Sequence, residues 1–204
     1  MKELLMSPLP IDATHAERHH FIATTRVVAI DLDGVCCDYV HAIRQTLRDD
    51  LAVPTDAELA LWLSDRTHRI EHQAAHDRGV AAGMYRTMRE IPGAIAGIKA
   101  LQAAGLRIHI VTARGTSWDD PVLAREQTLF WLRANDITVE SLNLLSPKSI
   151  FEADVFVDDN PGEIAALRAA GRRAIVFEQA YNRHVAGPRA RNWHDVVSML
   201  THDS

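Results

Sequence analysis

The stretch AIDLDGVCCDY, residues 29–39, ends an apolar run with two carboxylates. Asp31 and Asp33 follow directly after Val27–Ile30 and are two residues apart. Residues two apart on an extended chain point to the same side, so both carboxylates can address one atom. Crowded carboxylates repel each other, and a hard dication such as Mg²⁺ relieves that repulsion while it also binds phosphate oxygens. The pair therefore favours chemistry on a phosphate ester.

Three later segments that read as buried strands also end in, or are followed by, candidate site residues. These residues are Thr112, Ala113, Arg114, Lys148, Asp158 and Asp159. Because the carboxyl ends of parallel strands meet at one edge of a sheet, we expect these residues and the first acidic pair to converge. The motif DxDG alone also occurs in calcium loops, but this chain lacks the further spaced oxygen ligands and the terminal Glu of such a loop. The four segments in this order predict one site.

The residue types suggest how a phosphate ester could be hydrolysed there. Asp31 is a candidate nucleophile toward phosphorus, and Asp33 could protonate the leaving oxygen and later deprotonate a water. The Thr112 hydroxyl and neighbouring backbone N–H groups could hold phosphate oxygens, while Lys148 could neutralise charge on the transferred group. Asp31 and Asp159 could supply carboxylates to Mg²⁺.

The elements that must position these residues alternate between strand and helix from Gly93 onward. We expect helices that begin after Pro92, at Asp119–Asp120–Pro121 and at Asn160–Pro161, the second stopping in the left-handed region at Asn135, and strands over residues 106–113, 140–146, 153–159 and, last, 173–177. Near-continuous apolar strands between amphipathic helices predict an α/β fold with a Rossmann-like parallel sheet covered on both faces.

Residues 39–91 interrupt this alternation with helices and no convincing strand. Thr55 and Glu58 form a capping-box pattern for one helix, and another helical stretch starts near Thr67. An insert after the first strand lies beside the carboxyl ends of the strands, where it could act as a lid. We therefore expect the following units: an N-terminal arm at 1–25, an α/β core at 26–38 and 92–204, and a helical cap at 39–91.

The composition of the 204 residues narrows the function further. The formal net charge is −5, and the basic residues are dispersed, which argues against a nucleic-acid polymer as partner. No apolar run approaches the roughly 20 residues of a membrane span, and the N-terminus lacks the apolar region of a secretory signal. Cys36 and Cys37 are adjacent and cannot form a disulfide framework; packing is the expected role. We predict a cytoplasmic protein.

The four motifs together resemble the haloacid dehalogenase superfamily of phosphotransferases. The resemblance implies Asp31 as nucleophile and Asp33 as general acid/base that also gives a backbone carbonyl to Mg²⁺. Thr112 and Lys148 match the second and third motifs. Of the acidic pair in the fourth motif, Asp159 matches the usual metal ligand and Asp158 a supporting residue. An Asp at the second DxD position favours phosphatases over dehalogenases, and the insert resembles the C1-type cap.

Within the superfamily, several stretches resemble the 5'(3')-deoxyribonucleotidases. They are DLDGVCCDY, YRTMREIPGA, IVTAR and FEQAYNRH. This resemblance implies a nucleoside monophosphate as substrate and places an aromatic residue, Tyr39 here, against the nucleobase. Ala113 and Arg114 would contact the substrate. The animal enzymes carry a different residue after the Thr of this motif, so Arg114 would be a phosphate or substrate contact particular to this branch.

Other interpretations of the sequence stay open. The chain could hydrolyse another small phosphorylated metabolite, transfer the phosphoryl group to an alcohol, or bind ligands without catalysis. His68, His72 and His76 are four apart on one helical face, and three histidines in line along a helix are poorly placed to surround one metal ion. We therefore expect a polar lid face there. The sequence does not decide whether the chain forms a homodimer.

Overall fold

The structure is a computed structural model that describes residues 26–47, 55–117 and 119–201. Its centre is a parallel six-stranded sheet with the strand order β3-β2-β1-β4-β5-β6. The strands are β1 (Val27–Ile30), β2 (Arg107–Thr112), β3 (Ser141–Leu144), β4 (Val155–Asp158), β5 (Ala174–Phe177) and β6 (Arg189–Ala190). The order changes direction at β1, so β1 and β4 flank the point where such sheets bind ligands. The predicted α/β class is confirmed.

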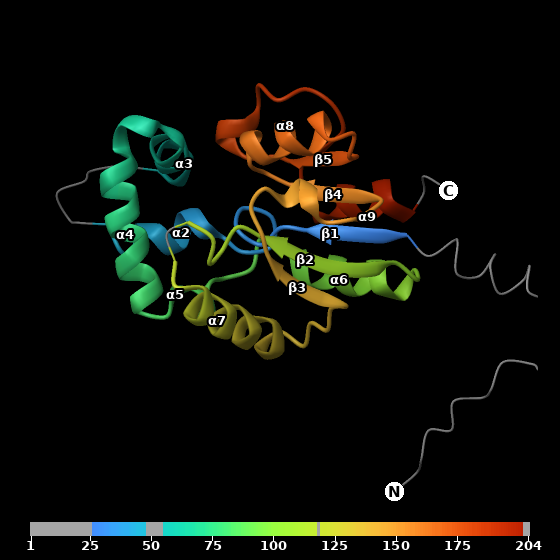
Figure 1. Ribbon diagram of the computed structural model, residues 1–204, viewed down its shortest axis with the longest axis horizontal. Helices are drawn as coiled ribbons and strands as arrows, with labels where there is room; N and C mark the ends of the chain where they lie inside the picture. The colour runs from blue at the N-terminus through green and yellow to red at the C-terminus, as the bar shows by residue number, and fades with distance from the viewer. Residues whose placement is uncertain (1–25, 48–54, 118, 202–204) are drawn as a thin grey trace, which may run out of the picture.

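Helices cover both faces of this sheet (Figure 1). The side chains of α6 (Ala94–Ala103), α7 (Pro121–Ala134) and α9 (Trp193–Thr201) share one apolar cluster with Val28, Ile30 and their neighbours. Those of α8 (Pro161–Ala169) pack in a second cluster with Ala29 and Phe156. Successive strand residues alternate between the two clusters because a pleated strand points them to opposite faces. The sheet is thereby buried and held rigid.

The described residues between β1 and β2 form helices outside the sheet, which we call the cap. They are α2 (Tyr39–Arg44), α3 (Asp56–Ser64), the 3-10 turn η1 (Arg66–His68), α4 (Arg69–Ala81) and α5 (Met84–Thr87). The capping box at the start of α3 is confirmed, because the Thr55 side chain accepts from the Glu58 N–H and the Glu58 side chain accepts from the Thr55 N–H. In Figure 1 the cap lies at the left, beyond the carboxyl ends of the strands. The domain limits 39 and 91 stay predictions.

Some local predictions were wrong. Asn135 has φ −103° rather than a left-handed conformation, and the next residue, Asp136, has φ 52°. The predicted start of α7 is confirmed, because Asp120 caps it by accepting from two backbone N–H groups and Pro121 is its first residue; Asp119 makes other contacts. The strand over residues 173–177 is not the last one, because the two-residue β6 pairs with it. The N-terminal arm at 1–25 lies outside the described residues.

The structure also bears on possible membrane-spanning helices and on the adjacent cysteines. Among the described helices, none combines the length and apolarity needed to cross a bilayer. Cys36 and Cys37 are fully buried free thiols, and burial raises the pKa of Cys37 to about 12. The Cys36 thiol donates to the Asp31 backbone carbonyl at 3.1 Å. Both residues pack against the start of the candidate site, as expected.

Candidate active site

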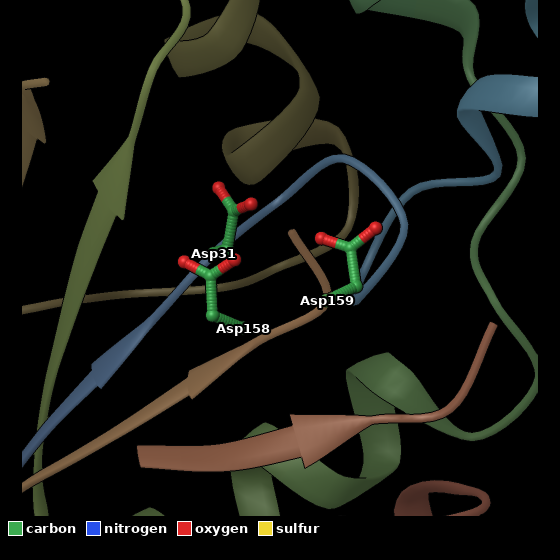
Figure 2. Close-up of side chains that lie close together, drawn as sticks. All are labelled: Asp31, Asp158 and Asp159. Atoms are coloured by element: carbon green, nitrogen blue, oxygen red, sulfur yellow. The ribbon is translucent and has the colours of Figure 1, made fainter. Parts of the chain in front are cut away.

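Carboxylates gather at the carboxyl edge of the sheet, where β1 and β4 end. Ile30 pairs with Val157 in the parallel ladder, so Asp31 and Asp158 follow at neighbouring positions. Together with Asp159, they place one carboxylate oxygen each within 4.8 Å of one another. Figure 2 shows the three side chains grouped above the ends of the two strands. The register of the sheet therefore fixes this acidic cluster.

Lys148 is the cation inside this cluster. Its Nζ lies 2.8 Å from Asp31 Oδ2 and 2.6 Å from Asp158 Oδ2, and the side chain is almost fully buried. Burial alone would lower the pKa of Lys148, but Asp158 and Asp31 raise it overall. Glu163 of α8 holds the segment in place, because its carboxylate accepts from the Lys148 backbone N–H at 3.0 Å and from the Ser146 hydroxyl at 2.8 Å. The ammonium is therefore fixed beside two carboxylates.

The charge of the cluster fits a divalent cation. The cluster holds three buried carboxylates and one ammonium group, which contacts two of them, so two negative charges are in excess when all are ionised. Burial raises the pKa of Asp31 to about 7 despite the attraction of Lys148. Burial, and then repulsion from Asp158 and Asp31, raises that of Asp159 well above its usual range. Asp31 Oδ1 is buried without a hydrogen-bond partner among the described residues. A dication would supply both the charge and the missing partner.

Asp159 is held from the other side by the segment that follows β5. The Tyr181 hydroxyl donates to Asp159 Oδ2, and the buried Asn182 amide donates to the Asp159 backbone carbonyl at 2.8 Å. Gly34 has φ +79°, and a Cβ at this position would overlap the Asp159 carboxylate. The turn after Asp33 therefore requires glycine for its conformation and for the close approach of that carboxylate.

Asp33 lies outside the acidic cluster and pairs with Arg114. The guanidinium makes a bidentate contact, with Nε 2.9 Å from Asp33 Oδ2 and Nη2 2.6 Å from Asp33 Oδ1. It also donates to Thr128 Oγ1 at 3.1 Å and lies 4.0 Å from the centre of the Tyr85 ring. Although Arg114 lines the pocket, these contacts support a role in holding Asp33. Direct contact with substrate stays a prediction.

The end of β2 brings the second predicted motif to the same edge. Thr112 is buried and Ala113 exposed, and both line the same pocket as Asp31 and Lys148. Thr112 Oγ1 accepts from the Arg114 backbone N–H at 3.4 Å, so the hydroxyl proton stays available for another acceptor. This arrangement can present a donor to an anion bound beside Asp31.

A pocket of about 870 Å³ opens above these residues, between the core and the cap. That volume lies within the range of small-molecule sites. Its core side carries the residues just described, and its cap side includes Tyr39, His72, His76 and Tyr85. His68 instead stacks on Trp62 with ring centres 4.5 Å apart. The pocket is large enough to hold a ligand group well beyond the acidic cluster.

The sequence interpretation missed several of these residues. It gave no role to Asn182, whose side chain is fully buried and supports Asp159. It did not single out Tyr181 or Glu163 at all. A signal for Tyr181 existed, because it follows β5, whose carboxyl end must lie at the same edge as that of β4. Among the described residues the only group suited to hold a metal is the acidic cluster, and the cap histidines form no such group.

Comparison with known proteins agrees with this geometry. Residues 25–203 match the family model described as "5' nucleotidase, deoxy (Pyrimidine), cytosolic type C protein". The chain is 32% identical over 180 residues to a protein of Chlorobaculum tepidum named "Putative 5'(3')-deoxyribonucleotidase", with 85% of this chain and 89% of that one covered. A Bordetella pertussis protein of the same name is 26% identical over 181 residues, with 84% and 95% covered.

Solved structures share the fold. A haloacid dehalogenase-like hydrolase from Streptococcus pneumoniae superposes with a TM-score of 0.62 at 12% identity and covers 87% of this chain and 99% of its own. A haloacid dehalogenase family hydrolase from Deinococcus radiodurans, solved with phosphate and sodium, has a TM-score of 0.55 at 17% identity and covers 87% and 96%. At such identities the likeness establishes the fold.

Proposed function

Because the chain belongs to the cytosolic type C 5'-nucleotidase family of the haloacid dehalogenase superfamily, we propose that it is a Mg²⁺-dependent phosphatase of nucleoside monophosphates that works through an aspartyl-phosphate. The observation that carries this proposal is the acidic cluster with its single buried lysine. Burying a cluster of carboxylates is costly, and a protein that only binds its ligand would not require both Asp31 and Asp33. A cytoplasmic location is part of the proposal.

Asp31 and Asp159 would hold the Mg²⁺, with the backbone carbonyl of Asp33 as a further ligand. Asp158 has both carboxylate oxygens engaged, one by Lys148 Nζ at 2.6 Å and one by the Asn160 backbone N–H at 2.9 Å, so it supports the site rather than completing it. When bound, the ion neutralises excess carboxylate charge and polarises a phosphate oxygen.

In the first step an Asp31 oxygen attacks phosphorus, and the bond from phosphorus to the ester oxygen breaks. Lys148 lies beside Asp31 and neutralises charge on the transferred phosphoryl group. The Thr112 hydroxyl donates a hydrogen bond to a phosphate oxygen. Asp33, protonated for this step, gives its proton to the departing sugar oxygen. Because both Asp33 oxygens contact Arg114, the contact at one oxygen must open for this transfer, while the contact at the other keeps the carboxyl group oriented. The products are the free nucleoside and an aspartyl-phosphate.

In the second step a water attacks the phosphorus of the aspartyl-phosphate. Asp33, now ionised, takes a proton from that water, and the bond from phosphorus to the Asp31 oxygen breaks. Inorganic phosphate leaves, and both carboxyl groups return to their starting states. Arg114 again holds Asp33 toward the reacting oxygen.

The cap side of the pocket supports the choice of a nucleotide. Tyr39 presents an aromatic ring there, and such rings stack on planar bases. A base and sugar would fill volume that a small phosphate ester leaves to water. Tyr39 therefore stays the predicted base-facing residue, and Ala113 the predicted neighbour of the phosphate.

Phosphate release from a panel of nucleoside monophosphates and sugar phosphates tests the proposal. We expect release from nucleotides that disappears with a chelator, returns with Mg²⁺ and is absent in Asp31→Asn. Rapid acid quenching followed by mass spectrometry of the Asp31 peptide should reveal the phosphate adduct. Turnover of sugar phosphates without any nucleotide would overturn the substrate class, and turnover unaffected by Asp31→Asn would overturn the mechanism.

A further inference from the structure

A chain of polar side chains joins the cap to the core outside the acidic cluster. The Tyr39 hydroxyl, at the start of α2, lies 2.9 Å from His72 Nε2 and 2.8 Å from His76 Nδ1. His76 Nε2 in turn lies 2.5 Å from Asp119 Oδ1. Asp119 belongs to the core segment between β2 and α7. The chain therefore runs from one wall of the pocket to the loop that follows Thr112.

Asp119 is the point where several donors meet. Its Oδ2 accepts from the Gly115 backbone N–H at 3.0 Å and from the Tyr85 hydroxyl at 2.8 Å. The His76 and Asp119 side chains are only 7% and 4% exposed. Although burial alone would raise the pKa of Asp119, these hydrogen bonds and His76 lower it overall. The carboxylate thus links two cap helices, α4 and α5, to the backbone of the loop that follows Thr112.

The hydrogen-bond pattern also limits what Tyr39 can offer a substrate. A phenol has one proton to donate, and both of its neighbours are imidazole nitrogens. His76 Nε2 faces the Asp119 carboxylate, which can only accept, so in the neutral imidazole His76 Nδ1 is an acceptor and takes the hydrogen bond from the Tyr39 hydroxyl. No proton is left for a nucleobase. The ring is the part of Tyr39 that can contact a substrate.

We propose that His76 and Asp119 are positioning residues, which act as one buried pair to fix the Tyr39 ring at the pocket wall and the loop that follows Thr112. Through this one contact between cap and core, the pair fixes the position of the Tyr39 ring at one end of the pocket and of the loop after Thr112 at the other. The substrate's base would meet the Tyr39 ring, and its phosphate would meet the loop at Ala113. This inference rests on the proposed nucleotidase function only for its kinetic readout.

Three variants distinguish the effect on the Tyr39 ring from the effect on the loop after Thr112. Tyr39→Phe keeps the ring and removes the hydroxyl, Asp119→Ala removes the junction, and Asp119→Asn keeps an oxygen that can accept from Gly115 or Tyr85. Glu71→Gln is the matched control, because Glu71 is exposed on α4 and does not line the pocket. Thermal melts establish that each variant is folded.

The kinetic test compares a pyrimidine deoxynucleoside 5'-monophosphate with deoxyribose 5-phosphate, which lacks a base. Tyr39→Phe should raise KM for the nucleotide about 3- to 10-fold with kcat retained, and leave the base-free ester unchanged. Asp119→Ala should lower kcat/KM about 10- to 100-fold for both, as is typical when a supporting contact to a site is lost. Asp119→Asn should recover part of that loss.

Hydrogen exchange gives a readout that does not depend on turnover. The Gly115 amide loses its acceptor in Asp119→Ala, so a peptide covering residues 113–117 should exchange at least several-fold faster than in the wild type or in Glu71→Gln. Unchanged exchange together with unchanged kinetics in both Asp119→Ala and Tyr39→Phe would overturn the inference. If the wild type hydrolyses neither ester, the proposed function has failed, and exchange alone decides the positioning role.

Discussion

The two walls of the pocket are built in different ways. The acidic wall rests on the sheet, where the ladder between β1 and β4 sets Asp31 beside Asp158 and a buried Lys148 joins them. The cap wall rests on helix packing, and Tyr39 and His76 meet there through a side-chain hydrogen bond. The groups that must react lie on the rigid element. The groups that would select a substrate lie on helices outside the sheet, and we predict that these helices can shift relative to it.

The core and the cap also differ in the apolar side chains that they bury. The core strands bury large apolar side chains such as Ile30 and Phe156. The cap also buries Ile43 and Tyr85, in the same apolar cluster as Ile30, but its longest helix, α4, buries only Ala75, His76, Gly79 and Val80. Leu61 and Ile70 of the cap are 50% and 82% exposed. Since stability follows buried apolar area, the cap should open locally at a lower free energy than the core.

Asp31→Asn should give the largest effect. The amide cannot act as the nucleophile, so we expect kcat to fall at least roughly a thousandfold. The fold should persist, because the change removes one of three crowded carboxylates and leaves Lys148 paired with Asp158. Steady-state kinetics and a guanidinium titration measure the two quantities. Strong activity in a correctly folded Asp31→Asn protein would contradict the assignment of the acidic wall as the reacting one.

Lys148→Met should affect both activity and stability. It leaves Asp31 and Asp158 buried without their cation, and breaking a buried ion pair costs about 3 to 5 kcal/mol. We expect a free energy of unfolding lower by about 3 kcal/mol without metal, partly restored by Mg²⁺, and a loss of activity of roughly a hundredfold. Unfolding titrations with a chelator and with Mg²⁺ provide the comparison. Equal stability in both conditions would argue against a cation site beside Lys148.

The two walls also differ in how far the sequence predicts them. Asp31, Thr112 and Asp158 end apolar strands, and all carboxyl ends of a parallel sheet meet at one edge, so their convergence follows from local patterns. The contact between His76 and Asp119 depends on how a cap helix sits against a core loop. No local pattern encodes that orientation. The sequence therefore predicted a polar lid face but not its partners.

His72 provides a pH test of the cap wall. Burial, and then the nearby His76, lower the pKa of His72 to about 4, against a hydrogen bond with the Leu63 backbone. The unfolded chain titrates near 6.5 and binds the proton first, so this contribution to stability is complete above pH 6.5 and decreases as the pH falls toward 4. Allowing for solvent screening of a partly exposed ring, we expect a loss of about 1 to 2 kcal/mol between pH 7.5 and pH 5.

His72→Asn, which cannot titrate, should show a smaller loss of stability over the same pH range. Urea titrations of both proteins at pH 7.5 and pH 5 measure the difference. The acidic wall is the same in both proteins, so its own pH dependence cancels. Parallel pH profiles for the two proteins would mean that His72 does not contribute to stability in this way.

Thr55→Ala should have the smallest effect and tests whether the cap opens by itself. Thr55 and Glu58 cap α3, and loss of such a cap costs about 1 kcal/mol. If the cap opens separately from the core, hydrogen exchange in α3 should accelerate about fivefold, while exchange in β4 and the global unfolding midpoint stay unchanged.

Asp120→Ala is the matched control, because Asp120 caps the core helix α7 and its loss should lower global stability by a similar amount. Equal global losses in both variants would show that cap and core unfold as one unit. The contrast between a rigid reacting wall and a separately mobile cap wall would then be wrong.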